Sequence, residues 1–128
     1  MPEKQAITTA NAPAAGGPYS QANVVGDFVF TAGQLGVDPQ TGQFVSDDVQ
    51  AQTRRALENL RAVLEAAGTD LAHVVKTTVF LSNMANFKAM NEVYATFFEP
   101  PYPARSAVAV KELPLGGLVE IEAVAVKP

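Results

Sequence analysis

The chain of 128 residues contains no cysteine and only one histidine, His73. Without cysteine it can form no disulfide, no thiolate metal site and no cysteine nucleophile. A histidine-based zinc site or a Ser–His–Asp triad would have to use His73, which lies in a polar stretch just after a predicted helix. We interpret it as an ordinary surface histidine. The sequence also lacks a metal-ligand cluster, a phosphate-binding glycine loop and a dinucleotide fingerprint, so we expect neither a metal nor a cofactor.

Clusters of basic residues and long apolar runs are also scarce. Nine Lys and Arg oppose 13 Asp and Glu, for a formal net charge of −4, and only Arg54 and Arg55 are adjacent. Because nucleic-acid affinity depends on clustered Lys and Arg that contact phosphates, we expect no nucleic-acid partner. No apolar run approaches the roughly 18 residues of a membrane span, and no apolar signal-peptide core is visible. We therefore expect a soluble, cytoplasmic protein with no membrane partner.

What the sequence does contain is the composition and periodicity of a folded domain. Hydrophobic residues make up 48% of the chain and charged residues 17%, which is typical of a globular protein. A helical period begins at Val49, after the capping residues 46–48, and ends at Gly68. A second helix is predicted for residues 85–98 and is stopped by the two prolines that follow it.

Stretches rich in β-branched and aromatic residues predict the strands. They lie near the amino terminus (an edge strand within 1–15), at 27–31 before the hairpin turn 38–42, after that turn, at 74–81, at 104–111 and at 118–126. The resulting order, β-β-β-α-β-α-β-β, predicts a single α+β domain over residues 1–128, with two helices on one face of a sheet.

The last two predicted strands carry a further signal, because both of their faces are apolar. In 104–111 valines alternate with alanines, and 118–126 is similarly apolar on its two sides. This pattern is typical of strands that are covered on both faces. Two helices cover only one face, so the other face needs a partner, and a second copy of the chain is the default. The pattern predicts an oligomer without setting its number of subunits.

Two charged residues occupy strand positions where apolar residues would be easier. Arg105 lies at the entry of the strand 104–111, where a guanidinium is costly unless it meets an anion or several acceptors. Since Arg binds a carboxylate through two parallel hydrogen bonds, it could anchor a small acid; an internal ion pair or contact with water is an equal alternative. Glu120 shares a strand face with Glu122. In a partly dry cleft Glu120 could position a water and accept its proton, although two solvent-facing glutamates are the simpler interpretation.

Asn91 and Tyr19 are further candidates. Asn91 lies between Phe87 and Tyr94 on the apolar stripe of the second helix, where a buried amide must be hydrogen-bonded to backbone or to a ligand. Tyr19 belongs to a loop, where an amphipathic aromatic side chain often lines a site. For both residues structural use is the commoner role. From the residues alone, the prediction stops at a small-anion site near Arg105.

At these residues the chain resembles the Rid family, also called YjgF/RidA. The resemblance covers essentially the whole chain in consistent order, and its motifs are specific as a set rather than one by one. The segments that carry it are Asn-Ala-Pro at 11–13, Gly-Pro-Tyr-Ser-Gln at 17–21, Thr-Ala-Gly-Gln at 31–34, Asp-Pro-Gln-Thr-Gly at 38–42, Val-Lys-Thr-Thr-Val-Phe-Leu at 75–81, Asn-Glu-Val-Tyr at 91–94, Pro-Ala-Arg-Ser at 103–106 and Val-Glu-Ile-Glu-Ala at 119–123.

This resemblance implies a chorismate-mutase-like α+β fold, with a mixed sheet of about six strands and two helices on one face. It also implies a homotrimer with three sites in the clefts between subunits. As catalytic residues it implies Arg105, which grips the substrate carboxylate, and Glu120, which orients the attacking water. The substrate-binding residues that it implies are Tyr19, Gly33, Asn91, Arg105 and Ala107.

The implied activity is hydrolysis of reactive 2-enamine or 2-imino acids, such as 2-aminoacrylate/2-iminopropanoate and 2-iminobutanoate, to 2-keto acids and ammonia. Because such imines already hydrolyse in water, placing the substrate on Arg105 and a water near Glu120 suffices, without a cofactor or a covalent intermediate. The chain departs from many members at Ala32, where they carry Ser, and at Ala107, where they carry Cys. A backbone contact at Ala107 survives this change, whereas a thiol role does not.

Two other functions compete with this one. A non-catalytic sensor or regulatory protein could use the same carboxylate pocket. RNA cleavage or translation inhibition is a third possibility, and it fits the acidic charge poorly.

Overall fold

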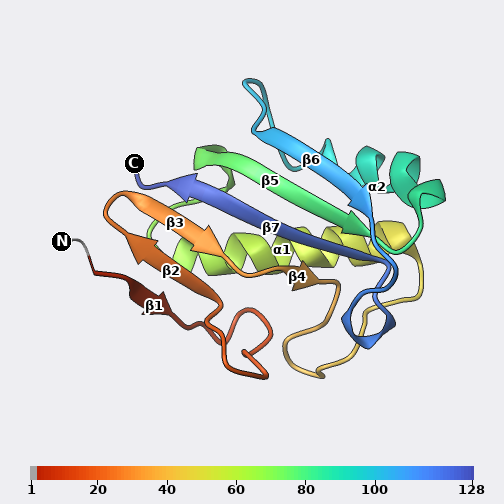
Figure 1. The fold of residues 1–128 in the computed structure, drawn as a ribbon, viewed down its shortest axis with the longest axis horizontal. Coiled ribbons are helices and arrows are strands. Elements are labelled where there is room, and N and C mark those ends of the chain that lie inside the picture. Colours follow the sequence, from red (N-terminus) through yellow and green to blue (C-terminus); the bar gives the residue numbers. More distant parts are fainter. Residues whose placement is uncertain (1–2) are drawn as a thin grey trace.

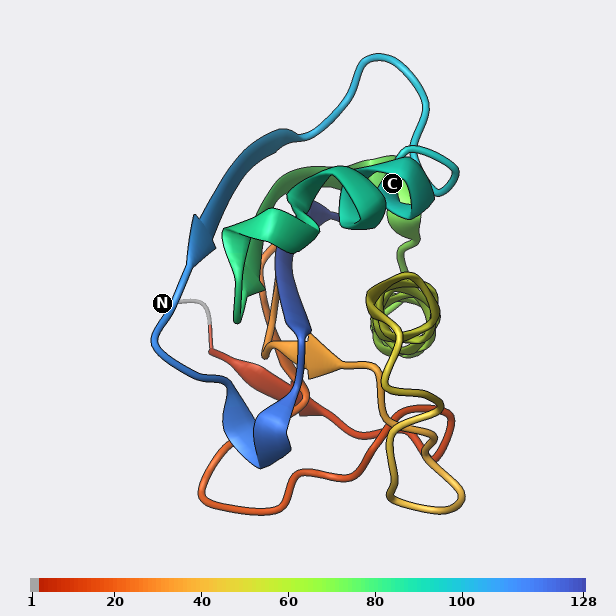
Figure 2. The same cartoon turned by 90° about the vertical axis from the view of Figure 1, so that its right-hand side faces the viewer.

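The structure of residues 3–128, a computed structural model, is a curved β-sheet with both α-helices on one of its faces (Figures 1 and 2). The α+β class is as predicted. The elements are, in chain order, β1 (Gln5–Ile7), β2 (Ala22–Val25), β3 (Phe28–Thr31), β4 (Gln34–Leu35), α1 (Val49–Ala66), η1 (Leu71–His73), β5 (Val74–Leu81), η2 (Met84–Asn86), α2 (Phe87–Tyr94), β6 (Ala104–Ala109), η3 (Pro114–Gly116) and β7 (Val119–Val126).

The sheet has the strand order β1-β2-β3-β7-β5-β6, and β4 pairs with β7 beside β3, so it contains seven strands rather than about six. β5 and β6 run parallel, and the other strand pairs are antiparallel. The parallel pair needs a crossover, which passes through α2. Thus β6 and β7, consecutive strands in the sequence, lie on either side of β5.

Three local predictions need correction. The strand Ala22–Val25 was not predicted, because it is short, contains the polar Asn23, and is joined to β3 by the two-residue turn Gly26-Asp27. The turn at 38–42 forms, with the Asp38 N–H donating to Gln43 O at 2.8 Å. Its flanks, however, pair only through the single bridge between Val37 and Phe44 rather than through two strands.

The second helix is shorter than the predicted 85–98. A single 3₁₀ turn precedes α2, and α2 ends at Tyr94. Beyond Tyr94 the backbone hydrogen bonds are of the 3₁₀ type, which join residues three apart. The Thr96 N–H donates to Val93 O, and the Thr96 hydroxyl donates to the same carbonyl at 2.7 Å. A threonine that competes for backbone acceptors in this way favours the end of a helix.

The core lies between α1 and the sheet. The apolar stripe of α1 packs on the strands, and every second residue of β7 is buried beneath it. Asp48 caps the helix by accepting a hydrogen bond from the Ala51 N–H at 2.9 Å, as the capping prediction required. The side chains that are fully buried include Val29, Leu57, Leu60, Val63, Leu64, Val79, Leu81, Met90, Val119 and Ile121.

No α-helix covers the opposite face of the sheet within residues 3–128, and we call this the open face. It carries Phe28 and Phe30, each 47% exposed, and Val108, 44% exposed. Exposed apolar side chains on an uncovered sheet face are typical of an interface. That this face needs a partner stays a prediction, and these exposed apolar side chains are its physical basis. Among the helices that the structure describes, none is both long enough and apolar enough to cross a membrane.

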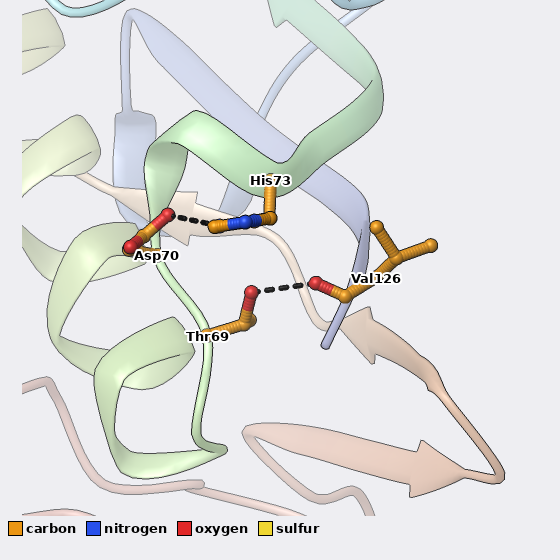
Figure 3. Close-up of polar contacts among 4 residues, drawn as sticks. All are labelled: Thr69, Asp70, His73 and Val126. Atoms are coloured by element: carbon orange, nitrogen blue, oxygen red, sulfur yellow. Dashed lines mark hydrogen bonds and ion pairs between the residues drawn. The ribbon is translucent and has the colours of Figure 1, made fainter. Parts of the chain in front are cut away.

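The connection from α1 to β5 is fastened to the end of β7 (Figure 3). The Thr69 hydroxyl donates to Val126 O at 2.6 Å, and His73 Nδ1 lies 2.7 Å from a carboxylate oxygen of Asp70. The His73 side chain is 36% exposed, so the histidine lies at the surface, as predicted, and forms a local pair. It precedes β5, whose far end pairs with Glu120, and therefore lies away from the candidate site.

Asn59 ties α1 to the segment that leads into the hairpin turn. Its side chain is fully buried; Nδ2 donates to Leu35 O at 3.1 Å and to Val37 O at 2.8 Å, and Oδ1 accepts from Arg55 Nε at 2.9 Å. Replacing it leaves two backbone carbonyls without donors in a dry environment.

We predict that Asn59→Leu lowers the free energy of unfolding by about 2 kcal/mol. The measurement is urea unfolding at equal chain concentration, with Asn86→Ala as the control because the Asn86 side chain makes no capping hydrogen bond. The control should change stability by less than about 0.5 kcal/mol. Equal, small losses in the two variants would contradict the role assigned to Asn59.

Candidate functional site

Arg105 lies on the edge strand β6, in register with Thr77 of β5. Thr77 is buried on the helix side of the sheet, where its hydroxyl is 2.7 Å from the Tyr94 hydroxyl of α2. Since partners in a parallel ladder point to the same face, Arg105 also projects toward α2. There its Nη1 donates to Asn91 Oδ1 at 2.6 Å. Asn91 is half-buried, and its amide oxygen accepts a hydrogen bond from a charged group.

Two aromatic rings complete the setting of this guanidinium. Its Cζ lies 4.7 Å from the ring centre of Tyr94 and 5.4 Å from that of Phe87. Phe87, Asn91 and Tyr94 follow one another at helical spacing on α2, so one helix face supplies all three contacts. The sequence placed Phe87 and Tyr94 in the core stripe and did not assign them to the site; their spacing around Asn91 was the signal that could have done so.

Ala107 lies two residues beyond Arg105 and projects to the same side of β6, in register with Val79. We call Phe87, Asn91, Tyr94, Arg105 and Ala107 the arginine half-site. No carboxylate within residues 3–128 lies within ion-pair distance of Arg105. Among the described residues the guanidinium hydrogen-bonds with Asn91 alone, which leaves its other N–H groups able to bind an anion.

Glu120 lies on β7 and points to the open face, because its neighbour Ile121 is buried beneath the helices. It lines a cavity of about 730 Å³ together with Tyr19 and Gly33. We call Tyr19, Gly33 and Glu120 the glutamate half-site. A β-carbon at Gly33 would lie 2.7 Å from the carboxyl carbon of Glu120, so glycine is what allows the carboxylate to lie against this backbone.

The loop that carries Tyr19 is held by Gln21. This buried side chain accepts from the Thr9 N–H at 2.7 Å and donates to Thr9 O at 3.1 Å and to Pro13 O at 2.8 Å. The Tyr19 hydroxyl accepts from the Gly16 N–H at 3.2 Å, while the ring stays 56% exposed. Gln21, which the sequence did not single out, therefore positions one wall of the cavity.

Burial raises the pKa of Glu120 above its ordinary value of 4.5, and the negative charge of Glu122 on the same face raises it further. A carboxylate in this setting is a stronger base than one in water. Burial also raises the pKa of Tyr94, while its hydrogen bond with Thr77 and the charge of Arg105 act in the opposite direction. Tyr94 therefore stays a neutral phenol beside the guanidinium.

The two half-sites do not meet within one chain. Arg105 pairs with Thr77 and Glu120 with Phe80, so the two residues are two strands apart and three residues out of step along β5. Standard sheet spacings place their Cα atoms about 14 Å apart, on opposite faces. The structure therefore brings together Arg105, Asn91 and Ala107 in one place and Tyr19, Gly33 and Glu120 in another. Within residues 3–128 no three acidic or histidine side chains are grouped closely enough to hold a metal ion.

The fold and these half-sites define an α+β protein that presents a guanidinium and a partly desolvated carboxylate on opposite faces of one sheet. Comparison with known proteins makes this class specific. The chain belongs to the Rid (YjgF/RidA) family, because the family model described as Endoribonuclease L-PSP matches residues 9–127.

Several relatives are similar over almost their full length. The chain is 53% identical to a RutC family protein of Pyrococcus horikoshii over 97% of this chain and 98% of that protein. It is 46% identical to a protein of Homo sapiens named 2-iminobutanoate/2-iminopropanoate deaminase, over 97% and 90% of the two chains. Among solved structures, RidA of an Antarctic Psychrobacter superposes with a TM-score of 0.92 at 47% identity, covering 95% and 98%. Escherichia coli TdcF with bound serine superposes with a TM-score of 0.92 at 44% identity, covering 98% and 100%.

We predict that Glu120→Gln makes the protein more stable near neutral pH. Because the pKa of Glu120 is raised in the folded state, the stability that this group contributes is present at low pH and is lost as the pH rises through that pKa. Glutamine removes the loss. Urea unfolding near neutral pH should favour the variant, and the difference should disappear below pH 4.5, the ordinary value.

The control for this comparison is Glu112→Gln, since Glu112 is an exposed glutamate outside the cavity. It should change stability by less than about 0.5 kcal/mol at either pH. If Glu120→Gln were destabilising near neutral pH, the carboxylate would be a stabilising part of the fold rather than a group held for a ligand.

Proposed function

We propose that this protein hydrolyses reactive 2-imino acids and their enamine tautomers, such as 2-aminoacrylate/2-iminopropanoate and 2-iminobutanoate, to 2-keto acids and ammonia. The observation that carries the proposal is the guanidinium of Arg105, which is held by Asn91 and two aromatic rings with no carboxylate of residues 3–128 beside it. Relatives that are 46% to 48% identical over most of their length and are named 2-iminobutanoate/2-iminopropanoate deaminase support the same activity.

Arg105 is suited to hold the carboxylate of such a substrate. One N–H of the guanidinium is engaged by Asn91, and the rings of Tyr94 and Phe87 restrict its plane. The remaining N–H groups form the planar fork that binds a carboxylate through two parallel hydrogen bonds. A preformed arginine of this kind loses little conformational freedom when it binds a small acid.

The complete site requires a second copy of the chain. Since Arg105 and Glu120 lie on opposite faces of the sheet, one substrate of a few carbon atoms cannot reach both in a single chain. We propose a homotrimer in which the arginine half-site of one subunit faces the glutamate half-site of its neighbour. The apolar side chains of the open face, among them Phe28 and Phe30, supply surface for such an assembly.

The chemistry then needs only positioning and one base. Arg105 holds the carboxylate and so fixes the imine carbon. Glu120 of the neighbouring subunit takes a proton from water as the water oxygen bonds to that carbon. That proton is delivered to the imine nitrogen, which gives a carbinolamine. Glu120 then takes the proton of the new hydroxyl group and passes it to the amino nitrogen, so that the C–N bond breaks, ammonia leaves and the C=O bond of the 2-keto acid forms. The raised pKa of Glu120 makes it a better proton acceptor than an exposed glutamate.

The two departures from many family members are compatible with this scheme. Ala32 lines the cavity and Ala107 lies beside Arg105, and neither can supply a hydroxyl or a thiol. The hydrolysis assigns no bond-making step to either residue. At Ala107 the backbone remains available for a hydrogen bond with the substrate.

A sensor that binds 2-keto acids without turnover is the alternative, because the arginine half-site would serve it equally well. The family model's description, Endoribonuclease L-PSP, suggests RNA cleavage as another function. The formal net charge of −4 disfavours binding of RNA, and the adjacent Arg54 and Arg55 lie on the helix α1. A cytoplasmic location and the absence of nucleic-acid and membrane partners stay predictions.

We predict that Arg105→Ala lowers kcat/KM for 2-iminobutanoate by about 100-fold, because two charge-assisted hydrogen bonds to the carboxylate are lost. Arg105→Lys should recover only part of this loss, since an ammonium lacks the planar fork. The imine is generated in situ by a threonine dehydratase, and formation of the 2-keto acid is followed.

Arg61→Ala is the matched control, because Arg61 also stacks on an aromatic ring, at 5.2 Å from the centre of Phe97, but lies outside both half-sites. Its kcat/KM should equal that of the unsubstituted protein. Full activity in Arg105→Ala would contradict the proposal. Binding of 2-keto acids by the unsubstituted protein without any turnover would favour the sensor.

A further inference from the structure

The cavity of the glutamate half-site is bordered by a turn that contains an unusual residue. Leu115 has φ 60° and ψ 15°, and within residues 3–128 it is the one non-glycine residue with positive φ. Gly116 follows with φ 76°. Two successive left-handed residues suit glycine and asparagine, whereas a leucine there is strained by its β-carbon. The Leu115 side chain is nonetheless 78% exposed, so burial within the chain does not offset the strain.

The strained conformation belongs to an anchored turn. Leu113 before it is buried, the Gly116 N–H donates to Leu113 O at 3.2 Å, and the Gly117 N–H donates to Pro114 O at 3.1 Å. A β-carbon at Gly117 would lie 2.8 Å from a methyl group of Leu35, so the turn packs directly on β4. Leu115 is therefore held at the tip of a turn whose two ends are fixed.

The position of this tip connects it to the candidate chemistry. Leu115 lines the same cavity as Glu120, and the apolar part of the lining also includes Pro13, Leu35, Val37 and Pro114. The cavity of about 730 Å³ is larger than an imino acid of three carbon atoms needs. Strained backbone conformations that no contact within the chain stabilises are found mainly at sites that contact ligands.

We infer that Leu115 is a specificity-determining residue, which contacts the aliphatic side chain of the imino acid and favours branched substrates over 2-iminopropanoate. This inference rests on the proposed function. With the carboxylate on Arg105 and the imine carbon near Glu120, an aliphatic side chain would extend along the apolar wall that Leu115 completes. Contact with that side chain removes apolar surface of Leu115 from water, which favours the bound state.

The test compares three substitutions at this position. Leu115→Asn introduces a polar side chain of similar size that suits positive φ. Leu115→Gly also relieves the backbone strain and removes the side chain. Leu115→Met keeps an apolar side chain and the strain. The probes are the imines that an amino-acid oxidase forms in situ from leucine and from alanine. Semicarbazide traps the imine that remains, so hydrolysis is measured as a decrease in the semicarbazone formed. We expect Leu115→Asn and Leu115→Gly to lower the ratio of kcat/KM for the leucine imine to that for the alanine imine by about ten-fold, while raising Tm. Leu115→Met should retain the ratio.

The outcomes separate this inference from the function on which it rests. A lowered ratio in Leu115→Asn, with the same assembly size in gel filtration and a retained ratio in Leu115→Met, supports the inference. An unchanged ratio in Leu115→Asn overturns it, and so does a ratio that falls only together with dissociation of the assembly, which would make Leu115 a subunit contact. If the unsubstituted protein hydrolyses neither imine, the proposed function fails and the inference fails with it.

Discussion

The proposed site depends on one interaction, the hydrogen bond from Arg105 to Asn91 Oδ1, together with the two rings that border the guanidinium. A half-buried arginine is normally neutralised by a carboxylate, because an unpaired charge away from water is costly. Here a neutral amide and two π-faces orient the guanidinium while its net charge stays uncompensated by any acidic side chain of residues 3–128. This arrangement leaves the charge complementary to an anion supplied from outside the chain.

The sheet separates the two charged groups that the proposed reaction uses. Because successive residues of a strand point to opposite faces, Arg105 faces α2 whereas Glu120 faces the side without helices. The same face carries the exposed Phe28 and Phe30. The proposed chemistry and the exposed apolar surface therefore support the same proposal, in which copies of the chain lie side by side.

Periodicity predicted the elements that are long and regular. The helix from Val49 and the strand 74–81 form as expected, because one apolar stripe or one alternating run decides each of them. The strand Ala22–Val25 and the early end of α2 were missed, because they depend on a two-residue turn and on the hydroxyl of Thr96 rather than on apolar pattern. Arg105 and Glu120 could be proposed as out-of-place charges; their location on opposite faces could not, since it depends on β5 lying between β6 and β7.

The most direct measurement of a shared site is complementation between two inactive chains, Arg105→Ala and Glu120→Gln, produced separately and co-expressed with different tags. If the chain forms the proposed trimer, a mixed assembly has one cleft of three that combines an intact Arg105 with an intact Glu120. Random mixing of equal amounts should therefore restore about a quarter of the specific activity of the unsubstituted protein. If both residues served within one subunit, every cleft of the mixed assembly would lack one of them, and activity would stay at the level of the parent variants.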